Sequence, residues 1–116
     1  MQRPLSIAFR DLDPSPAVET RVRSHVEKLE HFYNQIVGCH VVIDAPHHRQ
    51  HKGKLYRATI NIKVPSDEII VNSAGSKSHA HEDVYVAIRD AFDAAERRLE
   101  DYARRARDAR RTPDVS

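Results

Sequence analysis

The chain has 116 residues, of which 40% are hydrophobic and 31% are charged, and its net charge at pH 7 is +2. A chain of this length can fold as one domain around a core that needs no disulfide or structural metal. Its only cysteine, Cys39, excludes an intrachain disulfide and fits a reducing compartment. No apolar run approaches the roughly 18 residues of a membrane helix, and the N-terminus lacks the apolar segment of a signal peptide. We therefore expect a soluble, cytoplasmic protein with no membrane partner.

The positive charge is concentrated near the C-terminus. Residues 97–116 carry a net charge of +3, so residues 1–96 carry −1. A local excess of this kind is typical of a docking patch for an anionic partner.

The first half of the chain predicts a strand and then a helix. Residues 5–10 alternate between apolar and polar side chains, the period of a half-buried strand. Ser15 and Pro16 have the residue types of an N-cap and a first helical position, and Gly38 is placed to end the helix that follows. The apolar stripe of this helix consists of Val18, Val22, Val26, Leu29, Phe32, Tyr33 and Ile36.

Three strands and a second helix follow. Residues 39–45, 56–64 and 68–72 predict the strands, with a polar loop over residues 46–53 and a turn over residues 65–67. Residues 77–102 then have an unbroken helical pattern that leads into a run of arginines. Ser78 is a candidate N-cap, and Glu82 and Asp83 lie near the positive end of the helix dipole. The apolar stripe is Val84, Ile88, Ala91, Phe92, Ala95, Leu99 and Tyr102.

The order β-α-β-β-β-α indicates an α+β fold, a two-layer sandwich in which two helices pack on one face of a four-stranded sheet. Short connections join the last three strands and predict an antiparallel meander. The first strand reaches its partner through a helix, so that pair can be parallel. We assign residues 1–111 to a single domain and residues 112–116 to a flexible tail.

If the helices cover one face of the sheet, the other face is polar. It then carries Arg10, His40, Asp44, Arg57, Asn61 and Lys63. A solvated sheet face explains this pattern in many proteins. Here four of the six residues are basic or can become so, and the adjacent loop adds Arg49, Lys52 and Lys54.

The arginines at the end of the second helix also have two interpretations. One or two cations would stabilise a helix C-terminus through its dipole by roughly 0.3–1 kcal/mol each. Seven exceed that need, and the arginine fork can bind two phosphate oxygens at once. We therefore predict contacts with a phosphate backbone. The seven are Arg97, Arg98, Arg104, Arg105, Arg107, Arg110 and Arg111.

No residue pattern indicates catalysis. The chain has no P-loop, no nucleophile elbow and no Cys–His signature, and Glu82 and Asp83 are adjacent, so on a helix they point about 100° apart. Five histidines have the chemistry of metal ligands, but their spacing matches no metal motif; they are His47, His48, His51, His79 and His81. We expect no enzyme, no catalytic residue, no metal, no cofactor and no small-molecule substrate.

Aromatic residues are few, and most lie on the apolar stripes, so base stacking is not the expected mode of RNA binding. Tyr85 lies just off its stripe, next to His81. It can either pack at the edge of the helix or contact RNA.

Three stretches resemble one family. They are residues 15–19 with 26–30 (SPAVE and VEKLE), residues 56–62 (YRATINI), and residues 81–88 with 96–99 (HEDVYVAI and ERRL). Over about residues 4–105 the chain resembles the short ribosome hibernation-promoting factors, also called ribosome-associated inhibitors or sigma-54 modulation proteins. The predicted order of strands and helices is that of this family.

The resemblance implies a translation inhibitor that binds small-subunit rRNA in the channel of messenger and transfer RNA and silences idle ribosomes during stress or stationary phase. By the same resemblance, rRNA contacts are expected for Lys28, for the region of His81 and Tyr85, and for the arginines of the second helix. With the other basic residues, the predicted RNA-binding set is Arg21, Lys28, Lys52, Lys54, Arg57, Lys63, Lys77, His79, His81, Tyr85, Arg89, Arg97, Arg98, Arg104 and Arg105. Many relatives have a lysine where this chain has Ala80.

We expect the small ribosomal subunit to be the partner, and the free protein to be monomeric. The alternative is an adaptor or sigma-54 modulator that docks another protein on the same basic surface.

Overall fold

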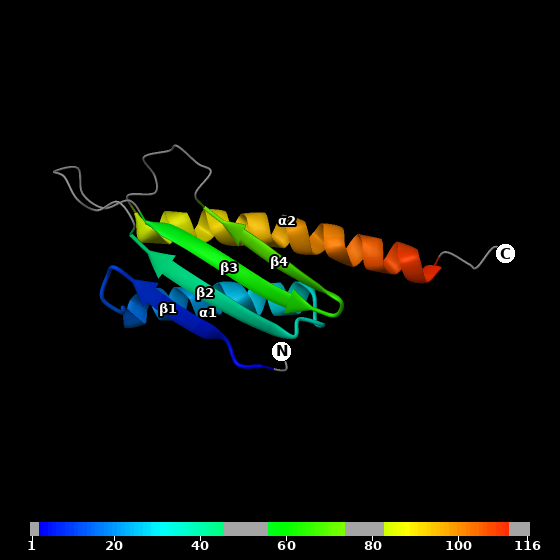
Figure 1. Ribbon diagram of the computed structural model, residues 1–116, viewed down its shortest axis with the longest axis horizontal. Coiled ribbons are helices and arrows are strands. Elements are labelled where there is room, and N and C mark those ends of the chain that lie inside the picture. Colours follow the sequence, from blue (N-terminus) through cyan, green and yellow to red (C-terminus); the bar gives the residue numbers. More distant parts are fainter. Residues whose placement is uncertain (1–2, 46–55, 74–82, 112–116) are drawn as a thin grey trace.

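The computed structural model describes residues 3–45, 56–73 and 83–111. Its elements are β1 (Ser6–Arg10), α1 (Pro16–Phe32), β2 (Gly38–Asp44), β3 (Arg57–Val64), β4 (Asp67–Asn72) and α2 (Val84–Arg111). The four strands form one sheet, and both helices lie on the same face of it (Figure 1). The predicted α+β two-layer arrangement is therefore confirmed. Within the described ranges, no helix is long and apolar enough to cross a membrane.

The strand order in the sheet is β1-β2-β3-β4. β1 runs parallel to β2, and β2, β3 and β4 form the predicted antiparallel meander. The connection through α1 allows the parallel pair, because the helix returns the chain to the starting end of the sheet. Between β3 and β4, Pro65 and Ser66 form the turn, and Ser66 has a φ of 71°, as the second central residue of a type II turn with proline at the first requires.

The core lies between the sheet and the two helices. Alternate residues of the inner strands are fully buried, as the period of a strand with one covered face requires; they include Val41, Ile43, Ala58, Ile60 and Ile62. The helices contribute the stripes that the sequence predicts, Val18, Val22, Val26 and Leu29 from α1 and Ile88, Ala91, Phe92, Ala95 and Leu99 from α2. Helical periodicity therefore identified most of the core correctly.

The start of α1 agrees with the sequence, but its end does not. Ser15 is the N-cap, and its Oγ accepts a hydrogen bond of 3.3 Å from the backbone N–H of Val18. The helix ends at Phe32, because Tyr33 adopts an extended conformation with φ −143° and ψ 109°. The prediction that Gly38 ends the helix is wrong, since Gly38 is the first residue of β2.

The cause of this error is the short connection between α1 and β2. Ile36 is buried and continues the apolar spacing of α1 although it lies outside the helix. Val37 already extends the pairing of β2 with β3, because its N–H donates to the carbonyl of Lys63 at 2.7 Å. Phe32, which the stripe included, is 43% exposed.

α2 is longer than the sheet that it covers. At 1.5 Å per residue its 28 residues span about 42 Å, whereas the eight residues of β3 span about 27 Å. Asp83 caps its start, with Oδ1 accepting from the N–H of Tyr85 at 2.9 Å; the predicted N-cap, Ser78, lies outside the described residues. At the other end the helix continues past the sheet (Figure 1). The hydroxyl of Tyr102 donates to the carbonyl of Pro65 where it departs.

The two helices run in the same direction. Two ring contacts between α1 and α2, and a third between Tyr33 just after α1 and α2, follow in ascending order along both segments, which makes the helices parallel. The guanidinium of Arg21 lies 4.7 Å from the ring centre of Tyr85, the rings of His25 and Phe92 stack at 4.9 Å, and those of Tyr33 and Tyr102 meet edge to face at 5.9 Å. Both helix C-termini therefore lie at the end of the sheet that carries the β3–β4 turn.

Two isoleucines provide a matched test of this core. Ile60 is fully buried under the helices, whereas Ile70 of β4 is 52% exposed on the open face. Ile60→Ala should lower the free energy of unfolding by about 2–5 kcal/mol through lost burial and a residual cavity, and Ile70→Ala by less than about 1 kcal/mol. Urea denaturation measures both. Equal losses would contradict the assignment of the covered face.

The contact between α1 and α2 predicts a pH dependence of stability. Burial lowers the pKa of His25, and the nearby Lys28 and Arg21 lower it further, while Asp93 opposes them. Below the unfolded-state pKa of about 6.5, the unfolded chain therefore takes up a proton that the folded chain binds less tightly. Stability should be full above that pH and fall as the pH drops through it.

The test compares the free energies of unfolding of the wild type and His25→Gln at pH 8 and pH 5.5. The decrease should be smaller in the variant, because all other titrating groups are shared. The same decrease in both proteins would show that His25 does not contribute.

Candidate nucleic-acid interface

The exposed arginines of α2 lie on two rows. Arg97 and Arg104 are seven residues apart and so share one side of the helix, as do Arg98 and Arg105. All four side chains are exposed. The row of Arg97 and Arg104 lies opposite Leu99, which packs on the sheet, and therefore faces solvent.

The second row is turned toward the edge of the sheet. Arg98 Nη1 donates to the carbonyl of Ile70 in β4 at 3.4 Å. The donation shows that this carbonyl points away from β3, so Arg98 covers part of the unpaired edge of β4. Arg105, the next residue of this row, follows Tyr102 and lies in the part of α2 that extends past the sheet.

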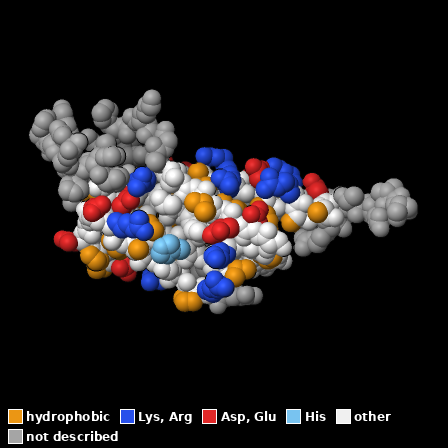
Figure 2. All heavy atoms as spheres, viewed as in Figure 1, with side chains coloured by type: hydrophobic (Ala, Val, Ile, Leu, Met, Phe, Trp, Pro, Cys, Tyr) orange, Lys and Arg blue, Asp and Glu red, His pale blue; other side chains and the backbone are white. Residues whose placement is uncertain are grey.

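Acidic residues neutralise only part of this cationic surface. Asp101 lies between the arginine rows and forms an ion pair with Arg104. Within the described residues, Arg97, Arg98 and Arg105 have no carboxylate oxygen within ion-pair distance. Figure 2 shows Lys and Arg side chains grouped along the part of the surface where Figure 1 places α2. Arg107 is also exposed there; the predicted set omitted it, although it belongs to the same arginine run.

The predicted residues on α1 and at the start of α2 have different surroundings. Lys28 is exposed on α1. Arg21 is exposed as well, but its guanidinium lies over the half-buried ring of Tyr85, a cation–π contact that joins the two helices. Tyr85 therefore packs at the helix edge, which is one of its two predicted roles. Arg89 is exposed and donates to Asp90 at 3.2 Å.

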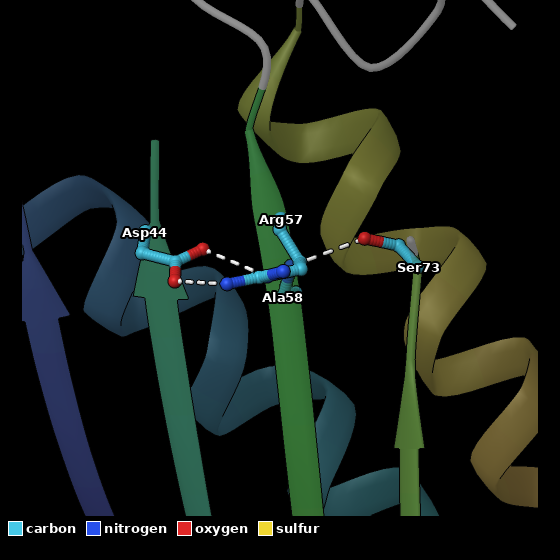
Figure 3. A network of polar contacts seen from close by, with 4 residues as sticks. All are labelled: Asp44, Arg57, Ala58 and Ser73. Atoms are coloured by element: carbon cyan, nitrogen blue, oxygen red, sulfur yellow. Dashed lines mark hydrogen bonds and ion pairs between the residues drawn. The ribbon is translucent and has the colours of Figure 1, made fainter. Parts of the chain in front are cut away.

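Arg57 is engaged within the protein. Its Nε and Nη2 donate to the two carboxylate oxygens of Asp44 at 3.2 and 2.9 Å (Figure 3). The hydrogen bond to Asp44 raises the pKa of Arg57. The pair links β2 to β3 across the open face, so the RNA contact predicted for Arg57 would compete with Asp44.

Ser73 forms hydrogen bonds to β3 at the same end of the sheet, on the β4 side of that strand. Its Oγ accepts from the N–H of Ala58 at 3.1 Å (Figure 3). Its own N–H donates to the carbonyl of Ala58, also at 3.1 Å. Ser73 thus extends the pairing of β3 and β4 by one residue and fixes the strand ends from which residues 46–55 and 74–82 depart. Those two segments contain Lys52, Lys54, Lys77, His79 and His81, which lie outside the described residues.

The open sheet face is nearly balanced in charge, unlike the end of α2. Strand register places the cations Arg10, Arg57 and Lys63 there, together with the anions Asp44 and Glu68. Lys63 is exposed at the opposite end of β3 from Arg57. The α2 surface is therefore the stronger cationic surface of the described structure.

The described residues contain no group of three His, Cys, Asp or Glu side chains that could hold a metal ion. Of the histidines considered as ligands, all five lie outside those ranges. Cys39 is buried, and desolvation, with a smaller contribution from Glu30, raises the pKa of its thiol to about 12. Such a thiol stays protonated near neutral pH and is a poor nucleophile.

Comparison with known proteins identifies the family. The model of the family described as Sigma 54 modulation protein / S30EA ribosomal protein matches residues 5–107. The chain belongs to this family. It is thus a member of a family of ribosome-associated proteins, as its resemblance predicted.

Two solved structures of similar fold agree with the S30EA arrangement. A ribosomal subunit interface protein from Coxiella burnetii is 18% identical, with a TM-score of 0.67 over 85% of this chain and 96% of that one. The N-terminal domain of Protein Y from Thermus thermophilus is 21% identical, with a TM-score of 0.65 over 84% of this chain and 94% of that one. At these identities the likeness concerns the fold.

The Arg57–Asp44 pair predicts a structural role for a residue that also belongs to the predicted RNA-binding set. Arg57→Ala leaves the buried carboxylate of Asp44 without its partner and should cost about 1–3 kcal/mol of unfolding free energy. Lys63→Ala removes a charge from the same face of the same strand and should cost less than about 0.5 kcal/mol. Thermal denaturation of both variants measures the difference. A destabilisation by Lys63→Ala that equals that of Arg57→Ala would contradict this role.

Proposed function

We propose that this protein binds the small ribosomal subunit through rRNA, in the channel of messenger and transfer RNA, and silences idle ribosomes under stress. The observation that carries the proposal is the two rows of exposed arginines on the C-terminal half of α2, which begin at the β4 edge and continue past the sheet. Membership of the S30EA family supports a ribosomal partner in the cytoplasm. The protein acts as a bound inhibitor and catalyses no reaction.

The mechanism is electrostatic attachment followed by steric exclusion. Arginine forks on α2 neutralise rRNA phosphates and displace their counterions, which favours binding at low salt. Lys28, Arg21 and Lys63 add positive charge on α1 and on the sheet. The bulk of the sandwich then occupies the space that transfer RNA needs.

The geometry favours phosphate contacts over base contacts. The rings of Tyr33, Tyr85, Phe92 and Tyr102 are engaged in contacts where α1 meets α2, so stacking on a base would compete with these contacts. A helix with arginines on two adjacent rows can instead follow a phosphate backbone and needs no particular sequence. This is what a protein that binds every ribosome requires.

A second function has one observation in its favour. Ile70 is exposed beside a groove between β4 and α2, which is lined by Ile70, Val71, Asn72, Ala94, Arg97, Arg98 and Asp101. This mixture of apolar and charged side chains suits a protein partner, as the sigma-54 modulation name implies. Purification from starved cells separates the two functions: an RNA-free protein complex that persists after nuclease treatment would favour the adaptor.

The central prediction concerns the four arginines of the two rows. Replacing Arg97, Arg98, Arg104 and Arg105 together by Ala should release the protein from ribosomes in sedimentation assays. Loss of four phosphate contacts should reduce the slope of log K against log salt by about three to four. The free energy of unfolding should change by less than about 1 kcal/mol, because the side chains are exposed and alanine favours helix.

Single-charge variants provide the matched control. Arg105→Ala and Arg23→Ala each remove one exposed arginine from a helix, but only Arg105 lies in a proposed contact row. Ribosome binding should weaken with Arg105→Ala and stay at the wild-type level with Arg23→Ala. A quadruple variant that still binds ribosomes but melts at a much lower temperature would show that the arginines stabilise α2 through its dipole.

A further inference from the structure

The side of β4 that faces away from β3 carries backbone groups without a strand partner. β4 is the last strand in the order of the sheet, so only one of its two sides is paired (Figure 1). In an antiparallel pair, each residue turns both its N–H and its C=O either toward the neighbouring strand or away from it. The carbonyl of Ile70 accepts from Arg98 and points away from β3, so the N–H of Ile70 points outward as well.

Two contacts protect this edge only in part. The N–H of Glu68 donates to the Oδ1 of Asp67 at 2.7 Å, which occupies the edge near the β3–β4 turn. The contact of 3.4 Å between Arg98 Nη1 and the carbonyl of Ile70 is longer than the roughly 2.7–3.2 Å of an ordinary N–H···O hydrogen bond. Within the described residues, the N–H of Ile70 has no acceptor. The edge can therefore accept a further strand at Ile70 when the exposed side chain of Arg98 moves aside.

The groove beside this edge has room for such a strand. It lies between β4 and α2 and has a volume of about 540 Å³, within the roughly 300–1,000 Å³ of known ligand sites. Ile70, which is 52% exposed, supplies an apolar contact, and Arg97 and Arg98 supply positive charge. The carboxylate of Asp101 also lines the groove, but it forms an ion pair with Arg104. The groove thus combines an apolar edge with two available cations.

We propose that the outer edge of β4 binds an extended acidic peptide as a fifth strand of the sheet. The main chain of the peptide pairs with the N–H and C=O of Ile70, and its carboxylates lie on Arg97 and Arg98. Successive side chains of a strand face opposite sides, so every second peptide residue faces the groove and the others lie beside Ile70 on the open face. The partner is therefore a protein segment in which acidic and apolar residues alternate.

Charge and hydrogen bonding favour this partner over two others. Within the described ranges, neither Arg97 nor Arg98 has a carboxylate oxygen within ion-pair distance. A second copy that paired through β4 would place two α2 helices on the same face of one sheet, where their like charges repel. RNA has no ladder of backbone N–H and C=O groups to pair with Ile70. The inference goes beyond the proposed function, although the two arginines cannot bind rRNA and the peptide at once.

Amide hydrogen exchange of the full chain, followed by NMR, tests the proposal with three peptides. The first has seven residues, alternating valine and glutamate; the second has lysine in place of glutamate; the third is the first with all its backbone amides N-methylated. Saturation with the first should slow exchange of the Ile70 amide at least about tenfold, because exchange then requires the peptide to dissociate. The Ile69 amide, which faces β3, should exchange at the same rate with and without peptide.

The other two peptides are the matched controls. The lysine peptide lacks the carboxylates and the methylated peptide lacks the main-chain donors, so neither should protect Ile70. Absence of protection by the acidic peptide, or equal protection by either control, would overturn the proposal. Protection that depends on protein concentration alone would show pairing between two copies and would overturn it as well.

Two variants define the contacts. Ile70→Pro removes the outward N–H at a position where an edge strand tolerates proline, and it should abolish peptide binding; should this variant not fold, the methylated peptide tests the same hydrogen bond. Arg97→Gln should weaken binding at least about threefold through the loss of one exposed ion pair. Arg107→Gln removes the same charge from α2 beyond the sheet and should leave binding unchanged. Equal weakening by both Gln variants would reduce the effect to net charge and overturn the proposal.

Sedimentation with ribosomes separates this inference from the proposed function. If no peptide protects Ile70 but the four α2 arginines are needed for ribosome binding, only the inference about the β4 edge fails. If those arginines are dispensable for ribosome binding, the proposed function fails, and the exchange rate of Ile70 still decides the role of the edge.

Discussion

The arrangement depends on one constraint: the apolar face of a four-stranded sheet must be covered, and one of the two helices that cover it is longer than the sheet. Up to Tyr102 the residues of α2 are fixed by burial, since every third or fourth side chain packs on β3, β4 or α1. The hydroxyl of Tyr102 on Pro65 and its ring against Tyr33 are the last of these contacts. Beyond this point none of the described side chains of α2 is fully buried, and the sequence is rich in arginine.

The parallel course of the helices brings several features to one end of the molecule. The C-termini of α1 and α2 and the β3–β4 turn lie there, and so do the cations Arg3 and Lys63. At the other end of the sheet, Asp44 holds Arg57 and Ser73 closes the strands (Figure 3). Within the described residues, Arg3 and Lys63 at one end of the sheet form no ion pair, whereas Arg57 at the other end is paired with Asp44.

Much of this could be predicted from the sequence, because alternation and helical periodicity report burial directly. They identified the four strands, both helices and the cationic end of α2. The end of α1 was predicted wrongly, since Ile36 is buried in a connection and has the spacing of a helical residue. Burial alone does not distinguish these two cases.

The individual contacts of the candidate site were harder to predict from the sequence. The pairing of Arg57 with Asp44 depends on the register of β2 against β3, and the stacking of Arg21 on Tyr85 depends on how two helices are rotated about their axes. Neither follows from a local pattern.

The most direct test of the central claim is directed cleavage of rRNA from the end of α2. Ala109 is exposed there, and Cys39 is buried with a raised thiol pKa, so Ala109→Cys provides one reactive position for an iron chelate that generates hydroxyl radicals. The account predicts strand breaks in small-subunit rRNA that lines the channel of messenger and transfer RNA, and their loss when the four arginines are replaced. A protein that sediments with ribosomes but cleaves no small-subunit rRNA, or only rRNA of the large subunit, would contradict it.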